Sequence, residues 1–317
     1  MKYGIREICD VVLKAKANQM VGNKLFYKGE PVIYFDSLKT STMEGAATTV
    51  YAQGGRGNAR LIAWEGERTV TFTMEDALIS TAGLLILTGA GLIEATDEKP
   101  IVVHCVERVA DEKVTYIPAS GDFDASLTIL VDEVVSENAN ADIYVMFLDA
   151  DGNVATEPYR ATGLGNKISI TTIKEGDKVV YTPVFPTDIK SGMPVLVDYY
   201  TDKKANSGAQ QIEITPDKFG GNYYLEASTL FRDTNGTDMP AEFIIPNCKV
   251  QSNFTFTMAS SGDPSTFTFT MDAFPDYTRF NSTKKVLSAI QVIGGGENKN
   301  DIYRTKTSHD PAHEDLI

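Results

Sequence analysis

The sequence predicts a mostly-β protein, and three observations support this fold class. Val, Ile, Thr, Phe and Tyr dominate runs in which apolar and polar residues alternate, as half-buried antiparallel strands require. Turn residues interrupt these runs. A pattern of Phe, Val or Met alternating with Thr occurs three times, at residues 70–74, 254–258 and 267–271. Each copy predicts a strand with one apolar and one uncharged polar face, and the last two predict a long hairpin.

The connections follow from turn chemistry. Hairpin turns are predicted at residues 64–67, 149–153, 175–177 and 234–237. Residues 77–93 carry no charge, but these 17 residues fall short of the ~20 that a membrane-spanning helix needs. They predict one short flanking helix, with Ser80 as N-cap and Gly89 or Gly91 at its C-terminal end.

The charge is uneven along the chain, which suggests a division into domains. Of the net charge of −14, residues 111–200 contribute −9, with 15 acidic and 6 basic side chains. We expect an inserted acidic β subdomain at 111–181, with strands at 126–131 and 143–148. A main domain then consists of residues 1–110 and 182–296, followed by a polar C-terminal tail at 297–317, which we expect to be partly disordered. The acidic region should lie outside any assembly, because its charge is costly to bury.

Composition excludes several classes of protein. An acidic chain is a poor candidate for gripping nucleic acid through its phosphates. Cys9, Cys105 and Cys248 are far apart and unpaired in the sequence, so they indicate neither a disulfide framework nor a zinc site. Glu7 and Asp10 interrupt the region that a signal peptide would keep apolar. We therefore expect a chain that stays in a reducing compartment.

The glycine-rich segment at residues 54–60 has two interpretations. Phosphate binding would need a closing Gly-Lys-Ser/Thr or a third glycine followed by a helix, and neither is present. A flexible loop that contacts a neighbour is favoured. Asp149, Asp151 and Asn153 resemble the start of a calcium loop, but the closing Glu is out of register, which favours a turn.

No catalytic, cofactor-binding or metal-binding residues are predicted. His309 and His313 are four residues apart, but Pro311 lies between them in a polar terminus. His104 and Cys105 are neighbours in an apparent strand, so their side chains face opposite ways. The carboxylates are scattered, and Trp64 is interpreted as a packing or interface residue. We expect a protein that is not an enzyme.

Two stretches carry a family resemblance. Residues 49–68, followed by 71–80, resemble tail tube proteins (major tail proteins) of large tailed bacteriophages, and so do residues 245–254 together with 262–267. The resemblance implies a tail-tube-type β-sandwich or barrel with a flanking helix. In that family, hexameric rings stack so that their strands enclose a channel for DNA. The acidic region departs from a minimal tube subunit and resembles an added outer domain.

The resemblance implies a structural virion protein of the phage tail, assembled in the host cytoplasm and used in DNA ejection. Its implied partners are other copies of itself, the tape measure protein, and baseplate or tail terminator proteins. A sheath would join them in a contractile tail, and the sequence does not decide whether the tail contracts. DNA would pass through the lumen without specific binding, and no membrane is involved. The segment GGRGNAR then becomes an assembly loop that leads into a tube-wall strand.

The alternative is a β-module on the virion surface that binds host glycan or decorates the particle. Its mark would be exposed aromatic side chains clustered over a groove. The only candidates are Tyr199–Tyr200 and Tyr223–Tyr224, and neighbours in a strand split between two faces. An enzyme ranks third.

Overall fold

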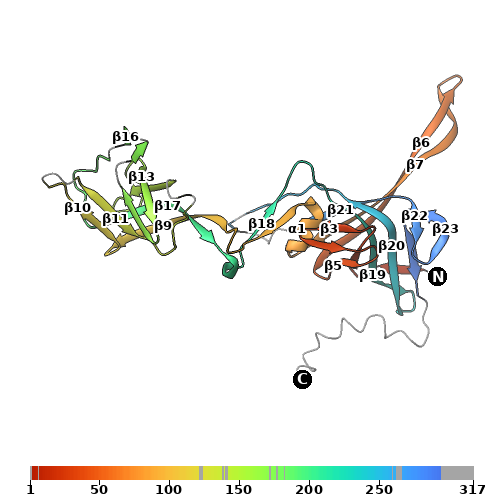
Figure 1. Cartoon of the computed structure of the whole chain (residues 1–317). Helices are drawn as coiled ribbons and strands as arrows, with labels where there is room; N and C mark the ends of the chain where they lie inside the picture. The colour runs from red at the N-terminus through yellow and green to blue at the C-terminus, as the bar shows by residue number, and fades with distance from the viewer. Residues whose placement is uncertain are drawn as a thin grey trace, which may run out of the picture. The chain divides into compact units, whose positions relative to one another are not determined.

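The chain folds into two compact units, each built almost wholly from strands (Figure 1). A computed structural model describes residues 2–5, 7–120, 124–137, 139, 142–170, 173–175, 178–181, 183–258, 260–261 and 266–293. Unit 1 consists of residues 1–92 and 212–317, and unit 2 of residues 93–211. The mostly-β prediction is confirmed, and the sheets include a curled half-barrel.

Unit 1 is organised around a nine-stranded sheet in the order β5-β2-β19-β20-β21-β7-β6, with β1 on β19 and β24 on β20. Its strands are β1 (Tyr3–Ile5), β2 (Asp10–Ala15), β5 (Pro31–Phe35), β6 (Leu38–Gly54), β7 (Ala59–Asp76), β19 (Asn222–Asp233), β20 (Asp238–Val250), β21 (Phe267–Ala273) and β24 (Ala289–Val292). Two small hairpins accompany it, β3 (Gln19–Val21) with β4 (Lys24–Phe26), and β22 (Asp276–Thr278) with β23 (Asn281–Val286). The strand pairs of this sheet that the structure describes run antiparallel.

The core of unit 1 follows from the alternation seen in the sequence. Phe72 and Met74 on β7 and Phe267, Phe269 and Met271 on β21 are at most 3% exposed. The intervening threonines lie on the opposite face of the sheet, since residues two apart share a face. Two of the three repeats of the Phe/Val/Met–Thr pattern therefore form strands as predicted.

The predicted helix is α1 (Thr81–Thr88), and its ends are those expected. Ser80 Oγ accepts a hydrogen bond from the Gly83 N–H at 3.0 Å, and the Gly89 N–H donates to Leu85 O at 2.9 Å. Gly89 has φ 67°, and a side chain there would come within 2.3 Å of the Phe219 backbone, so only glycine fits. Among the described residues, none of the helices has the length and apolar character to cross a bilayer.

Unit 2 has a seven-stranded sheet in the order β10-β11-β14-β13-β12-β17-β9 and its own core. Its elements are β9 (Ile101–Asp111), β10 (Val114–Ile117), β11 (Ser126–Leu130), β12 (Ile143–Phe147), β13 (Tyr159–Leu164), β14 (Lys167–Ile170), the pair β15 (Ile173–Glu175) and β16 (Lys178–Tyr181), β17 (Gly192–Lys203) and the 3-10 turn η1 (Ala205–Ser207). The strands predicted at 126–131 and 143–148 are β11 and β12. Residues 93–211 carry 20 acidic and 10 basic side chains, so this unit holds −10 of the net charge.

The compact unit is wider than the predicted segment 111–181. Both predicted boundaries fall inside it, because β9 pairs with β17 from Ile101 to Asp111. Charge counting finds the acidic residues but not this long-range pairing. At the unit boundary β8 (Gly91–Glu94) pairs with β18 (Gln210–Glu213), and the Ala95 N–H donates to Ala209 O at 3.0 Å. The predicted tail at 297–317 lies outside the described residues.

Two other predictions need correction. Residues 254–258 are exposed and belong to no strand, so they do not form the predicted hairpin with β21. The turn predicted at 64–67 is also wrong, because these residues lie within β7, and the chain reverses at 55–58 instead. Gly66 lies at an irregularity in the β6–β7 pairing, where the Glu67 N–H donates to Thr48 Oγ1 at 2.9 Å. The turns at 149–153 and 234–237 are confirmed.

Candidate assembly surfaces

The most unusual feature of unit 1 is the distal part of the β6–β7 hairpin, which projects from the sheet (Figure 1). Within residues 44–69, here called the arm, every residue is exposed except Ala52 and Gly54, which are half-buried. The remainder of the two strands, residues 38–43 and 70–76, is called the root. It contains the buried side chains of Leu38, Phe72 and Met74.

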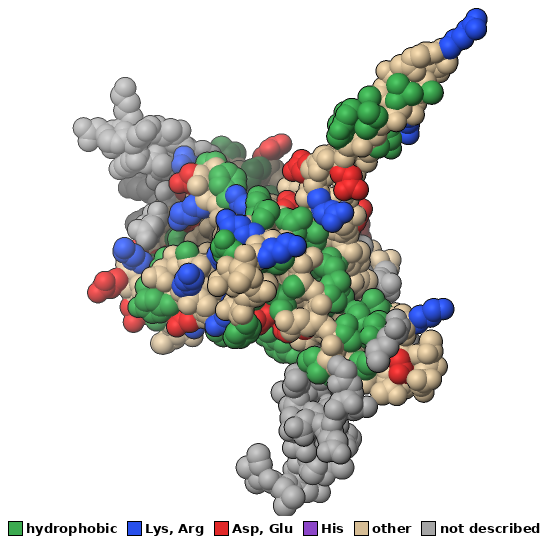
Figure 2. Space-filling view, turned by 90° about the vertical axis from the view of Figure 1, so that its right-hand side faces the viewer, with side chains coloured by type: hydrophobic (Ala, Val, Ile, Leu, Met, Phe, Trp, Pro, Cys, Tyr) green, Lys and Arg blue, Asp and Glu red, His purple; other side chains and the backbone are tan. Residues whose placement is uncertain are grey.

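One face of the arm is apolar. Its large side chains are 53–66% exposed and are called the arm stripe: Val50, Leu61, Ile62 and Trp64. Val50 stands opposite Trp64 and Ala52 opposite Ile62, and opposite residues of an antiparallel pair share a face. Leu61 reaches the same face, since its Cδ1 lies 3.7 Å from where a Cβ on Gly54 would be. Figure 2 shows hydrophobic side chains gathered along the arm below a basic tip.

The other face of the arm is polar. Tyr51, Gln53 and Arg60 lie on it, and the Arg60 guanidinium sits 4.1 Å from the centre of the Tyr51 ring. This cation–π contact gives the Tyr51 ring a favourable partner on the polar face. The arm is therefore amphipathic, and only the stripe face lacks cover.

The tip is the glycine-rich segment singled out in the sequence. Gly55, Gly57 and Asn58 have φ values of 78°, 90° and 50°, and the Asn58 N–H donates to Gly55 O at 3.2 Å. A Cβ on Gly55 or Gly57 would meet nothing within 4 Å, so these glycines supply backbone conformation and not space. The segment connects two strands, a context that favours the loop interpretation over a phosphate cradle.

A second surface is the threonine-rich face of the same sheet. In the root, Thr42 pairs with Thr73, and Thr73 pairs with Thr270 on β21, which forms one polar row across three strands. The next row consists of Thr40, Glu75 and Thr268. We call these six residues the threonine face; its one ionisable side chain is Glu75.

The third surface is a short aromatic ridge after β20, which we define as Phe254, Phe256 and Met258. These side chains are 38%, 42% and 89% exposed. The rings of Phe254 and Phe256 are 5.5 Å apart, and Phe256 lies 4.9 Å from Phe267, which is buried in the core. The chain leaves the sheet after the Gln251 N–H, which donates to Thr270 O at 2.8 Å. Beyond that point the Phe256 ring packs on Phe267, and residues 254–258 form no strand.

Unit 2 places its predicted candidates on the two faces of β9 and β17. His104 Nε2 lies 2.8 Å from Asp198 Oδ1 on the outer face. Cys105 faces the core, and burial raises the pKa of its thiol. Tyr199 points inward at 1% exposure, where burial next to Glu107 raises the pKa of its hydroxyl, and Tyr200 points outward. The predicted split of this pair is confirmed.

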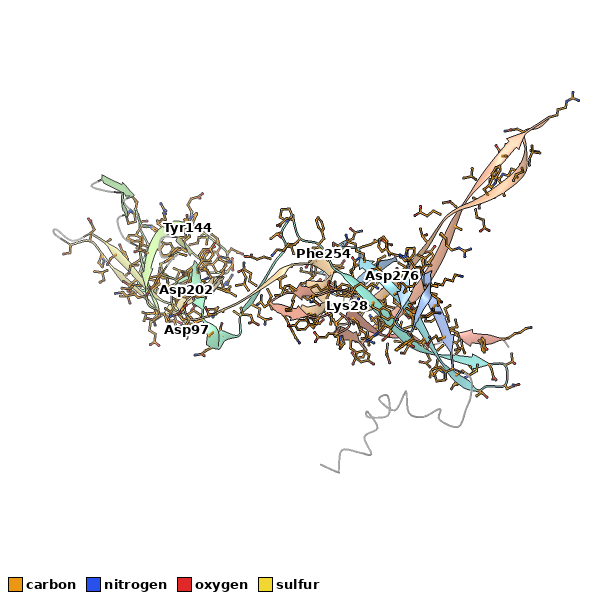
Figure 3. All side chains as sticks on the ribbon, turned by 45° about the vertical axis from the view of Figure 1, so that its right-hand side comes forward. Lys28, Asp97, Tyr144, Asp202, Phe254 and Asp276 are labelled. Atoms are coloured by element: carbon orange, nitrogen blue, oxygen red, sulfur yellow. The ribbon has the colours of Figure 1, made fainter. Side chains whose placement is uncertain are left out.

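The remaining tyrosine pair offers no platform, because Tyr223 and Tyr224 are both buried. The sequence interpretation missed an aromatic on the outer face of unit 2, Tyr144, which pairs with Asp198 and with Arg160. Its side chain is 37% exposed, and Figure 3 labels its position in unit 2. Its alternation with the buried Ile143 and Val145 was the available signal.

The Asp149 segment is a turn. Asp149 Oδ1 accepts from the N–H groups of Asn153 at 2.8 Å and Asp151 at 3.0 Å, and the Asn153 bond is the main cause that lowers the pKa of this carboxyl. Among the described residues, no group of three or more His, Cys, Asp or Glu side chains could hold a metal. His309 and His313 lie outside the described residues. The absence of catalytic, cofactor and metal sites stays a prediction.

Sequence reasoning found the tip of the arm but not the arm stripe. The available signal was the apolar alternation on both sides of the glycine-rich segment, which places Val50, Ile62 and Trp64 on one face of a hairpin.

Comparison with known protein families gives a match over most of the sequence. A family model described as the YomU/Tube protein family matches residues 4–119 and 123–286, which include nearly all of the described strands of both units. A search of curated proteins gives no match. Because the family model covers most of the sequence, the chain belongs to the YomU/Tube protein family.

Proposed function

We propose that this chain is the structural subunit of a phage tail tube, and that it forms stacked hexameric rings around a channel for DNA. Membership of the YomU/Tube family supports a tube-like structural protein and a virion component. The formation of stacked rings is proposed from the arm, a long two-stranded ribbon with an uncovered apolar stripe.

The arm has a physical need for a partner. A two-stranded hairpin on its own is marginally stable in water, and the arm has neither a third strand nor a core. Covering a large apolar side chain contributes about 1.5–3 kcal/mol when burial is complete. A copy of the chain that packs on the arm stripe would order the ribbon and gain this free energy, which is the behaviour expected of an assembly element.

The chemistry of the threonine face suits the wall of a DNA channel. Lysine and arginine clusters hold DNA through its phosphates, and this face has none among its six residues. Hydroxyl groups keep the face wetted, and the carboxylate of Glu75 repels phosphate. DNA would therefore pass such a wall without being held. The charge of −10 on unit 2 supports a position on the outside of the tube, in contact with water.

The experiment removes nearly all of the arm and keeps the root. Residues 47–68 are replaced by Asn-Gly, so that Ala46 and Thr69, which already pair, are joined by a two-residue hairpin turn. We expect the wild type to form rings and tubes by electron microscopy. The shortened chain should still unfold cooperatively, with circular dichroism reduced only by the lost strand residues of β6 and β7, but should form no tubes. Tubes of the shortened chain would reject the arm as the assembly element.

A second candidate function rests on the outer face of unit 2. Tyr144, Tyr200, His104, Asp198 and Arg160 lie together there, with the His104 and Tyr200 rings 5.4 Å apart. Exposed aromatic rings beside hydrogen-bonding groups suit a host glycan. Saturable binding on a glycan array that Tyr144→Ala abolishes would support this role, and an array without any binding would reject it.

A further inference from the structure

We infer that the acceptor for the arm stripe of one copy is the aromatic ridge of the next copy, so that assembly runs head to tail. This inference rests on the proposed tube function and names the contact that builds it. Both surfaces are apolar, and within unit 1 the ridge residue Phe254 lies away from the projecting arm (Figure 3). The two surfaces therefore belong to different ends of one unit.

The growth of a tube favours two different patches over one self-complementary patch. If arm met arm, each contact would be isologous and would close after two copies. A heterologous contact, in which one patch binds another elsewhere on the next copy, leaves a free patch at each end and continues. Unit 1 exposes other large apolar side chains as well, such as Leu78 and Phe280. We assign the acceptor part to the aromatic ridge because its rings stack on each other and on the core residue Phe267.

The chemistry of both patches suits a tight contact. Aromatic side chains dominate binding energies at interfaces, and Trp64 is the sole tryptophan of the chain. On the acceptor side, Phe256 is held in advance by Phe267 at 4.9 Å, so little side-chain entropy is lost on binding. The polar face of the arm, with Arg60 stacked on Tyr51, would remain in water.

The test uses one variant for each patch. Trp64→Glu places a charge in the arm stripe, and Met258→Glu places one in the ridge at a side chain that is 89% exposed, where folding should be unaffected. Phe256→Glu is a second ridge variant. Gln53→Glu, on the polar face of the arm, is the matched control. Each full-length chain is examined by sedimentation velocity and electron microscopy, alone and in equimolar mixtures.

We expect the stripe and ridge variants each to lose at least ten-fold in association, while the Gln53→Glu control assembles normally. A mixture of Trp64→Glu with Met258→Glu retains one intact contact, because one chain supplies a ridge and the other an arm. It should form pairs of the smallest assembling unit, chain or ring, and nothing longer.

Three outcomes would overturn the inference. Ridge variants that both build normal tubes would mean that the arm binds elsewhere, and the tube proposal would survive. A mixture that stays unassociated would show that stripe and ridge are not partners. A wild type that forms no assembly at all would reject the tube proposal and this contact with it.

Discussion

The root and the arm belong to the same two antiparallel strands, yet they differ in the burial of their apolar side chains. In the root, Phe72 stands between Met43 on β6 and Met271 on β21 and is 1% exposed. In the arm, Val50 and Trp64 also face each other across the hairpin, but they are 63% and 53% exposed. The difference is the third strand, because β21 ends alongside the root. Alternation alone does not decide whether a strand faces a core, since a neighbour must supply the cover.

The largest effect should come from emptying the root. Phe72→Ala leaves a cavity in the core and should lower the free energy of unfolding by about 3–5 kcal/mol. Trp64→Ala removes a larger side chain from the arm and should change this free energy by at most about 0.5 kcal/mol. Urea unfolding of the two variants as unassembled chains measures both values. Equal losses would mean that the arm is packed within its own chain.

The next effect concerns the tip, and it separates backbone conformation from charge. Gly57 has φ 90° and open space around it, so Gly57→Val is disfavoured by conformation alone. We expect a folded, soluble protein that stacks several-fold less well, whereas Arg56→Ala stacks nearly normally. Sedimentation measures the stacking.

The same segment allows a direct check of the phosphate alternative. No nucleotide should raise the Tm of the unaltered chain. A rise of several degrees that Arg56→Ala removes would overturn the loop assignment.

Removing unit 2 should have a smaller effect on assembly. Ala95 and Ala209 are joined by a backbone hydrogen bond, so a short Gly/Ser linker can replace residues 96–208 without stretching the chain. We expect calorimetry to lose the transition of unit 2 and to keep that of unit 1, with ring formation intact. A truncated chain that folds but no longer assembles would place unit 2 in the tube wall.

The smallest effect is a pH dependence within the packed sheet. Burial, and next the nearby Glu226, raise the pKa of Glu242 above its usual value, against the opposite influence of Lys14. The ionised carboxylate therefore costs stability once the pH exceeds the pKa of the unfolded chain. Glu242→Gln should raise the Tm by about 1–3 °C at pH 7. The gain should shrink towards zero near pH 4, where the carboxyl is largely protonated in both states.

The matched change Glu65→Gln, on the exposed arm, should leave the Tm within error at both pH values. A stabilisation by Glu242→Gln that persists unchanged at pH 4 would show that the charge is not its cause.

Local chemistry allowed much of the fold to be predicted. The ends of α1 follow from Ser80 and Gly89, whose capping bonds involve only residues within four positions. The strands β7, β11, β12 and β21 follow from their own alternation. The segment 254–258 has the same alternation as β21 but forms no strand, and its Phe256 ring packs on Phe267. Pairing partners are a long-range property, and a strand pattern does not name them.

The candidate surfaces were predictable only in part, for the same reason. The tip was recognised from Gly54–Asn58, but a competing turn signal at Gly66 hid the length of the hairpin. The boundary of the acidic unit depends on β9 and β17, whose pairing joins residues 81 to 102 positions apart. Such contacts depend on closing a long loop, and neither charge nor periodicity reports them.

Electron microscopy of the purified full-length chain over a range of concentrations is the most direct measurement of the proposed assembly. We predict hexameric rings that stack into tubes, with the arm of each ring in contact with the next ring. Particles that remain single chains at every concentration, without rings or tubes, would contradict the proposal that this chain builds a tail tube.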